Sequence, residues 1–147
     1  MSVGEYSTEM RIDATPEEVF PYLTDASLIV RWMGDWADLD PITGGRFTID
    51  INGIPIRGRY LAVEPPHRVV FSWGTPGHDR MPPESSTVEI TLRGDGESTI
   101  VELVHRHLPA EDLPQHGIGW GHFLQRLAMT ATGSDPGADP WAARSAG

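Results

Sequence analysis

Apolar and polar side chains alternate with a period of two along most of the chain's middle, which constrains the fold more than any other feature. Val88, Ile90 and Leu92, for example, alternate with polar residues. This period is typical of a strand with one buried face. Asn52-Gly53 predicts a tight hairpin turn, because both residues accept positive φ. Such patterns predict six strands, around residues 3–13, 47–51, 54–64, 69–73, 88–93 and 101–106.

Helix signals lie at the two ends of this strand region. Thr15-Pro16-Glu17-Glu18 combines an N-cap hydroxyl, a proline at the first helical position and a glutamate three residues after the cap. Asp25 predicts the start of a second short helix, and the chain from Gly34 onward is expected to be a loop. The longest helix is predicted from apolar residues at helical spacing, namely Trp120, Phe123, Leu124, Leu127, Ala128 and Ala131.

The order of these elements predicts an α+β protein with a curved antiparallel sheet, because no strand–helix–strand alternation occurs. One long helix cannot cover a curved sheet completely, so we expect either a filled core or an internal apolar cavity. The loop over residues 74–85 is interpreted as a lid or as a mobile connection. Residues 1–132 should form one domain, and the Gly-, Pro- and Ala-rich residues 133–147 a disordered tail.

Composition excludes several classes of function. The formal net charge of −10 disfavours binding to nucleic acid. Without cysteine, the chain has no disulfide, thiolate nucleophile or zinc–thiolate site. The longest apolar run is Tyr60–Val63, too short to span a membrane. The first five residues lack the basic and apolar regions of a secretion signal, so a cytoplasmic location is expected.

Histidine supplies the main candidates for polar chemistry. His116 and His122 diverge on the last helix, and no carboxylate stands at a matching spacing, so neither a metal nor another cofactor is expected. The alternation places His105 on the apolar side of its strand, where burial should keep it neutral. Two interpretations stay open: a core histidine satisfied by a partner, or a group that binds a ligand or acts as acid or base.

Aromatic residues recur on the expected inner surface, where buried indoles provide apolar area and a few directed donors. An aromatic core is the alternative for any one of them. The candidate ligand-binding residues are Trp32, Trp36, Phe47, Ile49, Phe71, Trp73, Val101, Leu103, His105, Trp120 and Phe123.

An ordered set of short motifs runs through the chain: Thr15-Pro-Glu-Glu-Val-Phe20, Leu23-Thr-Asp25, Arg31-Trp32, Gly44-Gly45-Arg46-Phe47, Gly58, Glu64-Pro-Pro66, Phe71-Ser-Trp73-Gly74, Val88-Glu-Ile90-Thr-Leu92, His105, and Gly119-Trp120 with Leu124 and Leu127. Over about residues 5–131 the chain thereby resembles the activator of heat-shock-protein-90 ATPase homologue-like family of the START-like, or SRPBCC, superfamily. The resemblance implies the helix-grip fold of the birch pollen allergen, with an internal cavity.

Three functions are compatible with this resemblance. The first is binding of a hydrophobic small molecule, aromatic or polyketide-like, for transport, sensing or self-protection. The second is a cyclase, dehydratase or hydrolase that uses His105 in the same cavity. The third is a chaperone-related or stress-linked protein-interaction module. A homodimer is left open.

Overall fold

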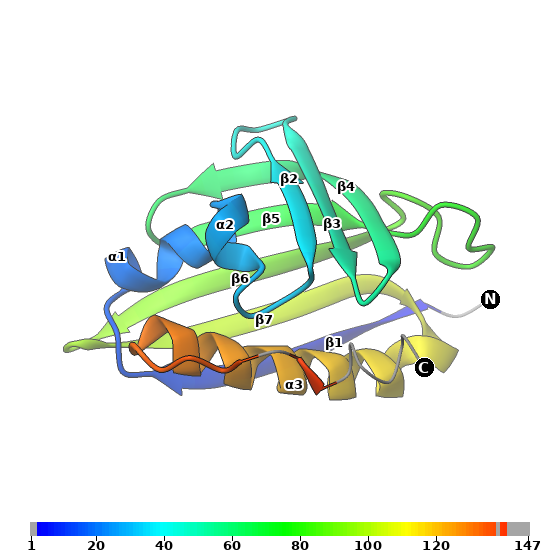
Figure 1. The fold of residues 1–147 in the computed structure, drawn as a ribbon. Helices are drawn as coiled ribbons and strands as arrows, with labels where there is room; N and C mark the ends of the chain where they lie inside the picture. Colours follow the sequence, from blue (N-terminus) through cyan, green and yellow to red (C-terminus); the bar gives the residue numbers. More distant parts are fainter. Residues whose placement is uncertain (1–2, 138, 141–147) are drawn as a thin grey trace.

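A seven-stranded antiparallel sheet forms the centre of the computed structural model, which describes residues 3–137 and 139–140. The strand order is β1-β7-β6-β5-β4-β3-β2. The expected α+β class, antiparallel sheet and helix-grip arrangement are confirmed (Figure 1). The strands are β1 (Val3–Ile12), β2 (Trp36–Leu39), β3 (Arg46–Ile51), β4 (Ile54–Glu64), β5 (Arg68–Trp73), β6 (Ser86–Asp95) and β7 (Ser98–Pro109).

The expected helix starts are also found. Helix α1 (Pro16–Val19) begins with a capping box, in which Thr15 and Glu18 bond to each other's backbone N–H. A 3₁₀ helix, η1 (Phe20–Leu23), follows directly, and α2 (Ala26–Ile29) is capped by Asp25, whose side chain accepts from the N–H of Ser27. A second 3₁₀ helix, η2 (Ala110–Asp112), leads into the long helix α3 (Leu113–Ala131).

Helix α3 packs with its apolar stripe against the sheet, as the sequence predicts. Trp120, Leu124 and Leu127 are all buried. In Figure 1, α3 runs along β1 and β7, while α1 and α2 lie over the same face of the curved sheet. The helix approaches β1 closely at Gly117, where a Cβ atom would lie 2.9 Å from a ring carbon of Tyr6. Glycine is therefore required there by the distance between helix and strand.

One strand was not predicted. The segment after Gly34, expected to be a loop, contains β2, which pairs with β3 at the edge of the sheet. The sheet consequently has seven strands rather than about six. β2 is only four residues long, and its strongest apolar residue, Trp36, faces outward with 48% of its surface exposed. A short edge strand of this kind does not need the apolar alternation that reveals a buried strand.

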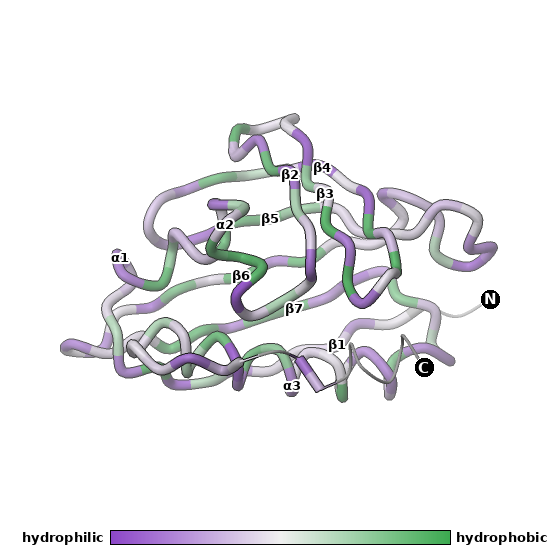
Figure 2. Tube along the Cα trace, viewed as in Figure 1, coloured by the Kyte–Doolittle hydropathy of each residue, from purple (hydrophilic) through white to green (hydrophobic). Residues whose placement is uncertain are grey.

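The hairpin turns follow the sequence signals, and the core fills the concave face. Asn52 and Gly53 adopt φ values of 52° and 85° between β3 and β4. The rings of Phe47 and Phe71 stack with centroids 3.9 Å apart, and Tyr60 meets Phe47 edge-on. Figure 2 shows hydrophobic and hydrophilic residues following each other along the central strands, while the β6–β7 turn is hydrophilic.

The described residues after α3 run back along that helix (Figure 1). The guanidinium of Arg126, 9% exposed, donates to the carbonyl oxygens of Trp32 at 3.3 Å, Pro136 at 3.4 Å and Gly137 at 2.8 Å. Residues 133–137 thereby contribute acceptors to a buried cation. The rest of the segment expected to be disordered, at 138 and 141–147, lies outside the described residues.

Candidate functional site

A cavity of about 260 Å³ lies between α3, the β3–β4 hairpin and the loop after β5. Its walls are mainly apolar. Ile51, Ile54, Ile56 and Trp73 line it from the sheet, and Met33 lines it from the segment after α2. An apolar cavity of about 150 Å³ holds one benzene ring, so this volume suits a molecule of about two fused rings.

The helix side of the cavity is formed by Gly119, Trp120 and Phe123. A Cβ atom built on Gly119 would have no heavy atom within 4 Å, so the missing side chain leaves open space. The indole of Trp120 lies 5.3 Å from that of Trp73 between ring centroids, tilted by 50°. Two indoles from opposite elements therefore form one corner of the cavity, with Gly119 beside them.

The polar groups gather at one end of the cavity. Thr75 and His78 come from the loop over residues 74–85, and Gln115 and His116 come from the first turn of α3. Within the loop, the Thr75 N–H donates to the carbonyl of Met81 at 2.7 Å. This arrangement, apolar walls with a few polar groups at one end, is typical of a small-molecule site.

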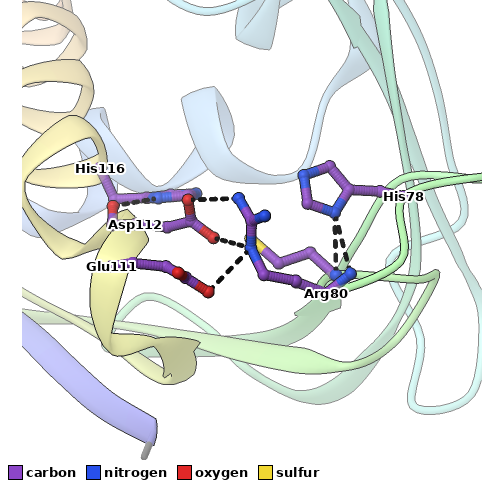
Figure 3. Close-up of polar contacts among 6 residues, drawn as sticks. His78, Arg80, Glu111, Asp112 and His116 are labelled. Atoms are coloured by element: carbon purple, nitrogen blue, oxygen red, sulfur yellow. Dashed lines mark hydrogen bonds and ion pairs between the residues drawn. The ribbon is translucent and has the colours of Figure 1, made fainter.

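An ion-pair cluster fastens the loop to the start of α3 (Figure 3). Arg80 lies 3.1 Å from an oxygen of Glu111 and 3.1 Å from an oxygen of the buried Asp112. The hydrogen bond that Arg80 donates to Asp112, followed by the charges of both carboxylates, raises the pKa of the guanidinium. Since Asp112 is buried, the guanidinium compensates a carboxylate that would be costly to leave unpaired. These contacts hold the loop over the cavity.

His105 lies behind the cavity wall and has partners on both ring nitrogens. Its Nδ1 accepts from Trp120 Nε1–H at 3.1 Å. Its Nε2 lies 2.9 Å from Ser86 Oγ, which itself donates to the carbonyl of Trp73 at 2.8 Å. The Ser86 hydroxyl proton is thus used, so the network assigns the imidazole proton to Nε2. Burial, with a smaller contribution from the charge of nearby His116, lowers the pKa of His105 to about 3.

The expected neutrality of His105 is therefore supported, and its surroundings match those of a satisfied core histidine. Its contacts give it a positioning role: it fixes the indole of Trp120, and Ser86 connects it to the strand that carries Trp73. Both indoles line the cavity. His105 itself does not.

The remaining sequence-predicted residues divide into three groups. Trp73, Trp120 and Phe123 line the cavity. Trp36 was expected to face inward, and this is wrong: it stands at the sheet edge beneath Arg57, whose guanidinium carbon is 5.5 Å from the ring centroid. The others are buried in the core away from the cavity lining, namely Trp32, Phe47, Ile49, Phe71, Val101 and Leu103.

Sequence reasoning missed most of the polar end. Thr75, His78 and Met81 belong to a loop without periodicity, and their position depends on the distant contact between Arg80 and Asp112. Gly119 could have been recognised, because a glycine in a helix beside a buried tryptophan indicates either close packing or open space.

Two kinds of site were searched for and not found in the described part of the chain. No group of three or more histidine, aspartate or glutamate side chains among residues 3–137 and 139–140 could hold a metal ion. Among these residues, too, no helix combines the length and apolar character that crossing a bilayer requires.

Comparison with known proteins gives a family and a fold. Residues 13–132 match the family described as Activator of Hsp90 ATPase homolog 1-like protein. None of the curated proteins matches the chain. The solution structure of an AHSA1-like protein from Rhizobium etli is 39% identical, with a TM-score of 0.76, over 95% of this chain and 89% of that one.

Two further solved structures show the same fold. DynU16, described as a putative protein in the dynemicin biosynthetic locus, is 27% identical with a TM-score of 0.77, over 89% of this chain and 48% of that chain. The Aha1 dimer from Colwellia psychrerythraea is 17% identical with a TM-score of 0.76, over 92% of this chain and 98% of that one. At such low identity the second likeness shows the fold alone.

Proposed function

Since this chain belongs to the Activator of Hsp90 ATPase homolog 1-like family, we propose that it binds a hydrophobic aromatic small molecule of about two fused rings in the cavity beneath α3. The cavity itself carries this proposal. Its walls combine Trp73, Trp120 and Phe123 with aliphatic side chains, and its volume of about 260 Å³ is that of a small ligand rather than of a packing defect.

The glycine at position 119 supports the proposal further. Glycine in a helix interior is less favourable than alanine by about 1 kcal/mol. No neighbour of Gly119 demands its small size, because the space beyond its Cα is open. A chain under selection for stability alone would gain from a side chain here, whereas a binding site needs the empty volume.

An enzyme that uses His105 as acid or base has less support. Both ring nitrogens of His105 are held by Ser86 and Trp120, and its lowered pKa keeps it neutral. A ligand could reach it only by displacing the Trp120 indole. A role in carrying, sensing or sequestering a small molecule fits a cavity of this kind better, and one structural neighbour is described as belonging to a biosynthetic locus.

Naphthalene is a suitable probe, because it has two fused rings and no polar group. Calorimetric titration of the wild-type protein should show one site. Gly119→Leu should fill the cavity and weaken binding at least about tenfold, the effect of losing roughly 1.4 kcal/mol of contact.

Gly121→Leu is the matched control. A Cβ atom at Gly121 also meets open space, but this residue is not part of the cavity lining. Both leucines should favour the helix, so both variants should be as stable as the wild type and only Gly119→Leu should lose the probe. Equal binding by the two variants, or no binding by the wild type, would remove the carrier proposal.

The cytoplasmic location expected from the sequence belongs to the same proposal, and cell fractionation checks it. The homodimer left open by the sequence stays a prediction, because the likeness to the Colwellia psychrerythraea dimer carries only the fold. Light scattering after size-exclusion chromatography would decide it.

A further inference from the structure

Two histidines at the polar end of the cavity are held by the backbone in opposite tautomers. His78 Nδ1 accepts from the backbone N–H of Arg80 at 3.2 Å and of Met81 at 3.0 Å (Figure 3). A ring nitrogen that accepts cannot carry a proton, so the proton of the neutral His78 ring is assigned to Nε2.

His116 has the reverse arrangement. Its Nδ1 lies 2.9 Å from the carbonyl oxygen of Asp112 (Figure 3). A carbonyl oxygen can only accept, so Nδ1 must donate, and the Nε2 of the neutral His116 ring is left as an acceptor. Among residues 3–137 and 139–140, neither Nε2 atom has a hydrogen-bond partner, and both rings line the cavity.

From this pair of tautomers, and resting on the proposed function, we propose that the ligand is a neutral phenol: a two-ring aromatic whose hydroxyl group binds between His78 and His116. The hydroxyl oxygen accepts from His78 Nε2–H, and the hydroxyl proton is donated to His116 Nε2. A phenol supplies both complements from one group, while its rings occupy the space beside Trp73, Trp120 and Gly119.

Other head groups match this end less well. A carboxylate has no proton to donate and would face the lone pair of His116 Nε2 as well as the carboxylates of Glu111 and Asp112, which lie at the same end. An ammonium group could donate to His116 but offers no acceptor to His78. A wholly apolar molecule would leave both imidazoles without partners, which costs binding energy when the cavity closes around it.

The test compares naphthalene, 2-methoxynaphthalene and 2-naphthol, which present no polar group, an acceptor only, and both an acceptor and a donor. The wild-type protein should bind 2-naphthol more tightly than 2-methoxynaphthalene by about two- to tenfold, the usual value of one hydrogen bond. 2-Methoxynaphthalene should in turn exceed naphthalene.

Asparagine variants separate the two rings without disturbing the backbone. In each, the amide takes over the position of Nδ1: its oxygen accepts from Arg80 and Met81 in His78→Asn, and its NH₂ donates to Asp112 in His116→Asn. His116→Asn should abolish the preference for 2-naphthol over 2-methoxynaphthalene. His78→Asn should lower the affinity for both oxygen-containing ligands, and both variants should bind naphthalene as the wild type does.

His67→Asn is the control, because His67 is exposed in the β4–β5 turn, and it should change none of the three affinities. If the wild type binds naphthalene but shows no preference for 2-naphthol, or if His116→Asn keeps that preference, the phenol inference is wrong and the apolar carrier stands. If none of the three ligands binds, the proposed function itself fails and this inference with it.

Discussion

Replacing His105 with leucine should make the stability of the protein less sensitive to acid. The folded state holds this imidazole neutral, since burial and the charge of His116 lower its pKa from 6.5 to about 3. The unfolded chain exposes the ring, which then takes up a proton below pH 6.5. Between pH 6.5 and 3 the unfolded state therefore binds one proton more than the folded state, so the stability of the wild type falls as the pH falls.

The size of this effect follows from the two pKa values. One proton taken up on unfolding lowers the free energy of unfolding by up to about 1.4 kcal/mol per pH unit. From pH 7 to pH 5 the loss amounts to about 2 kcal/mol. His105→Leu removes this contribution but leaves the Trp120 indole N–H without its acceptor, which costs about 1 to 3 kcal/mol at any pH. The wild type should thus be more stable at pH 7, and the two proteins should converge toward pH 5.

Urea denaturation of both proteins at half-unit steps from pH 7 to pH 5 measures this difference. Carboxylates with lowered pKa values, such as Glu89 beside Arg68 and Arg106, also lose stability in acid, but they do so equally in both proteins. His105→Gln is a second variant without a titrating group, and it keeps an acceptor for the indole should the leucine variant fail to fold. Parallel stability curves for wild type and variants would refute the argument for a buried neutral histidine.

Three further substitutions or deletions test the packing of α3. Gly119→Ala should raise the free energy of unfolding by about 1 kcal/mol, whereas Gly117→Ala should lower it, because its Cβ would lie 2.9 Å from an aromatic ring of β1; urea denaturation gives both values. Leu124→Ala, at a side chain 1% exposed, should cost about 2 to 5 kcal/mol, and a loss below half a kcal/mol would contradict the helix packing. Truncation after Thr132 should lower the melting temperature measurably, since it removes two carbonyl acceptors of the buried Arg126; an unchanged melting temperature would show that these contacts contribute nothing.

Much of the fold could be predicted because its signals are local. The alternation along β6 and β7 reflects one buried and one exposed face, and the Asn52-Gly53 turn and the Thr15 capping box are determined by neighbouring residues. The missed strand, β2, has no buried face to show in the sequence. Its pairing with β3 depends on where the chain returns after α2, which is a tertiary effect.

The candidate site was predicted less completely for a related reason. Parity along β7 and β5 correctly placed His105 and Trp73 inside, but parity cannot separate a residue that lines a cavity from one packed in the core behind it. The polar end depends on His78 and Arg80, which reach α3 only through contacts with residues more than thirty positions away. Such contacts leave no periodic pattern in the sequence.

The most direct test of the binding cavity is a titration with naphthalene observed through the tryptophan indole N–H signals in ¹H–¹⁵N NMR spectra. Trp73 and Trp120 line the cavity, whereas the Trp32 indole donates to the carbonyl of Tyr22 at 3.0 Å away from it. The Trp73 and Trp120 signals should shift in a saturable manner while the Trp32 signal stays in place. Saturating shifts absent from Trp120, or of equal size at Trp32, would contradict a ligand site beneath α3.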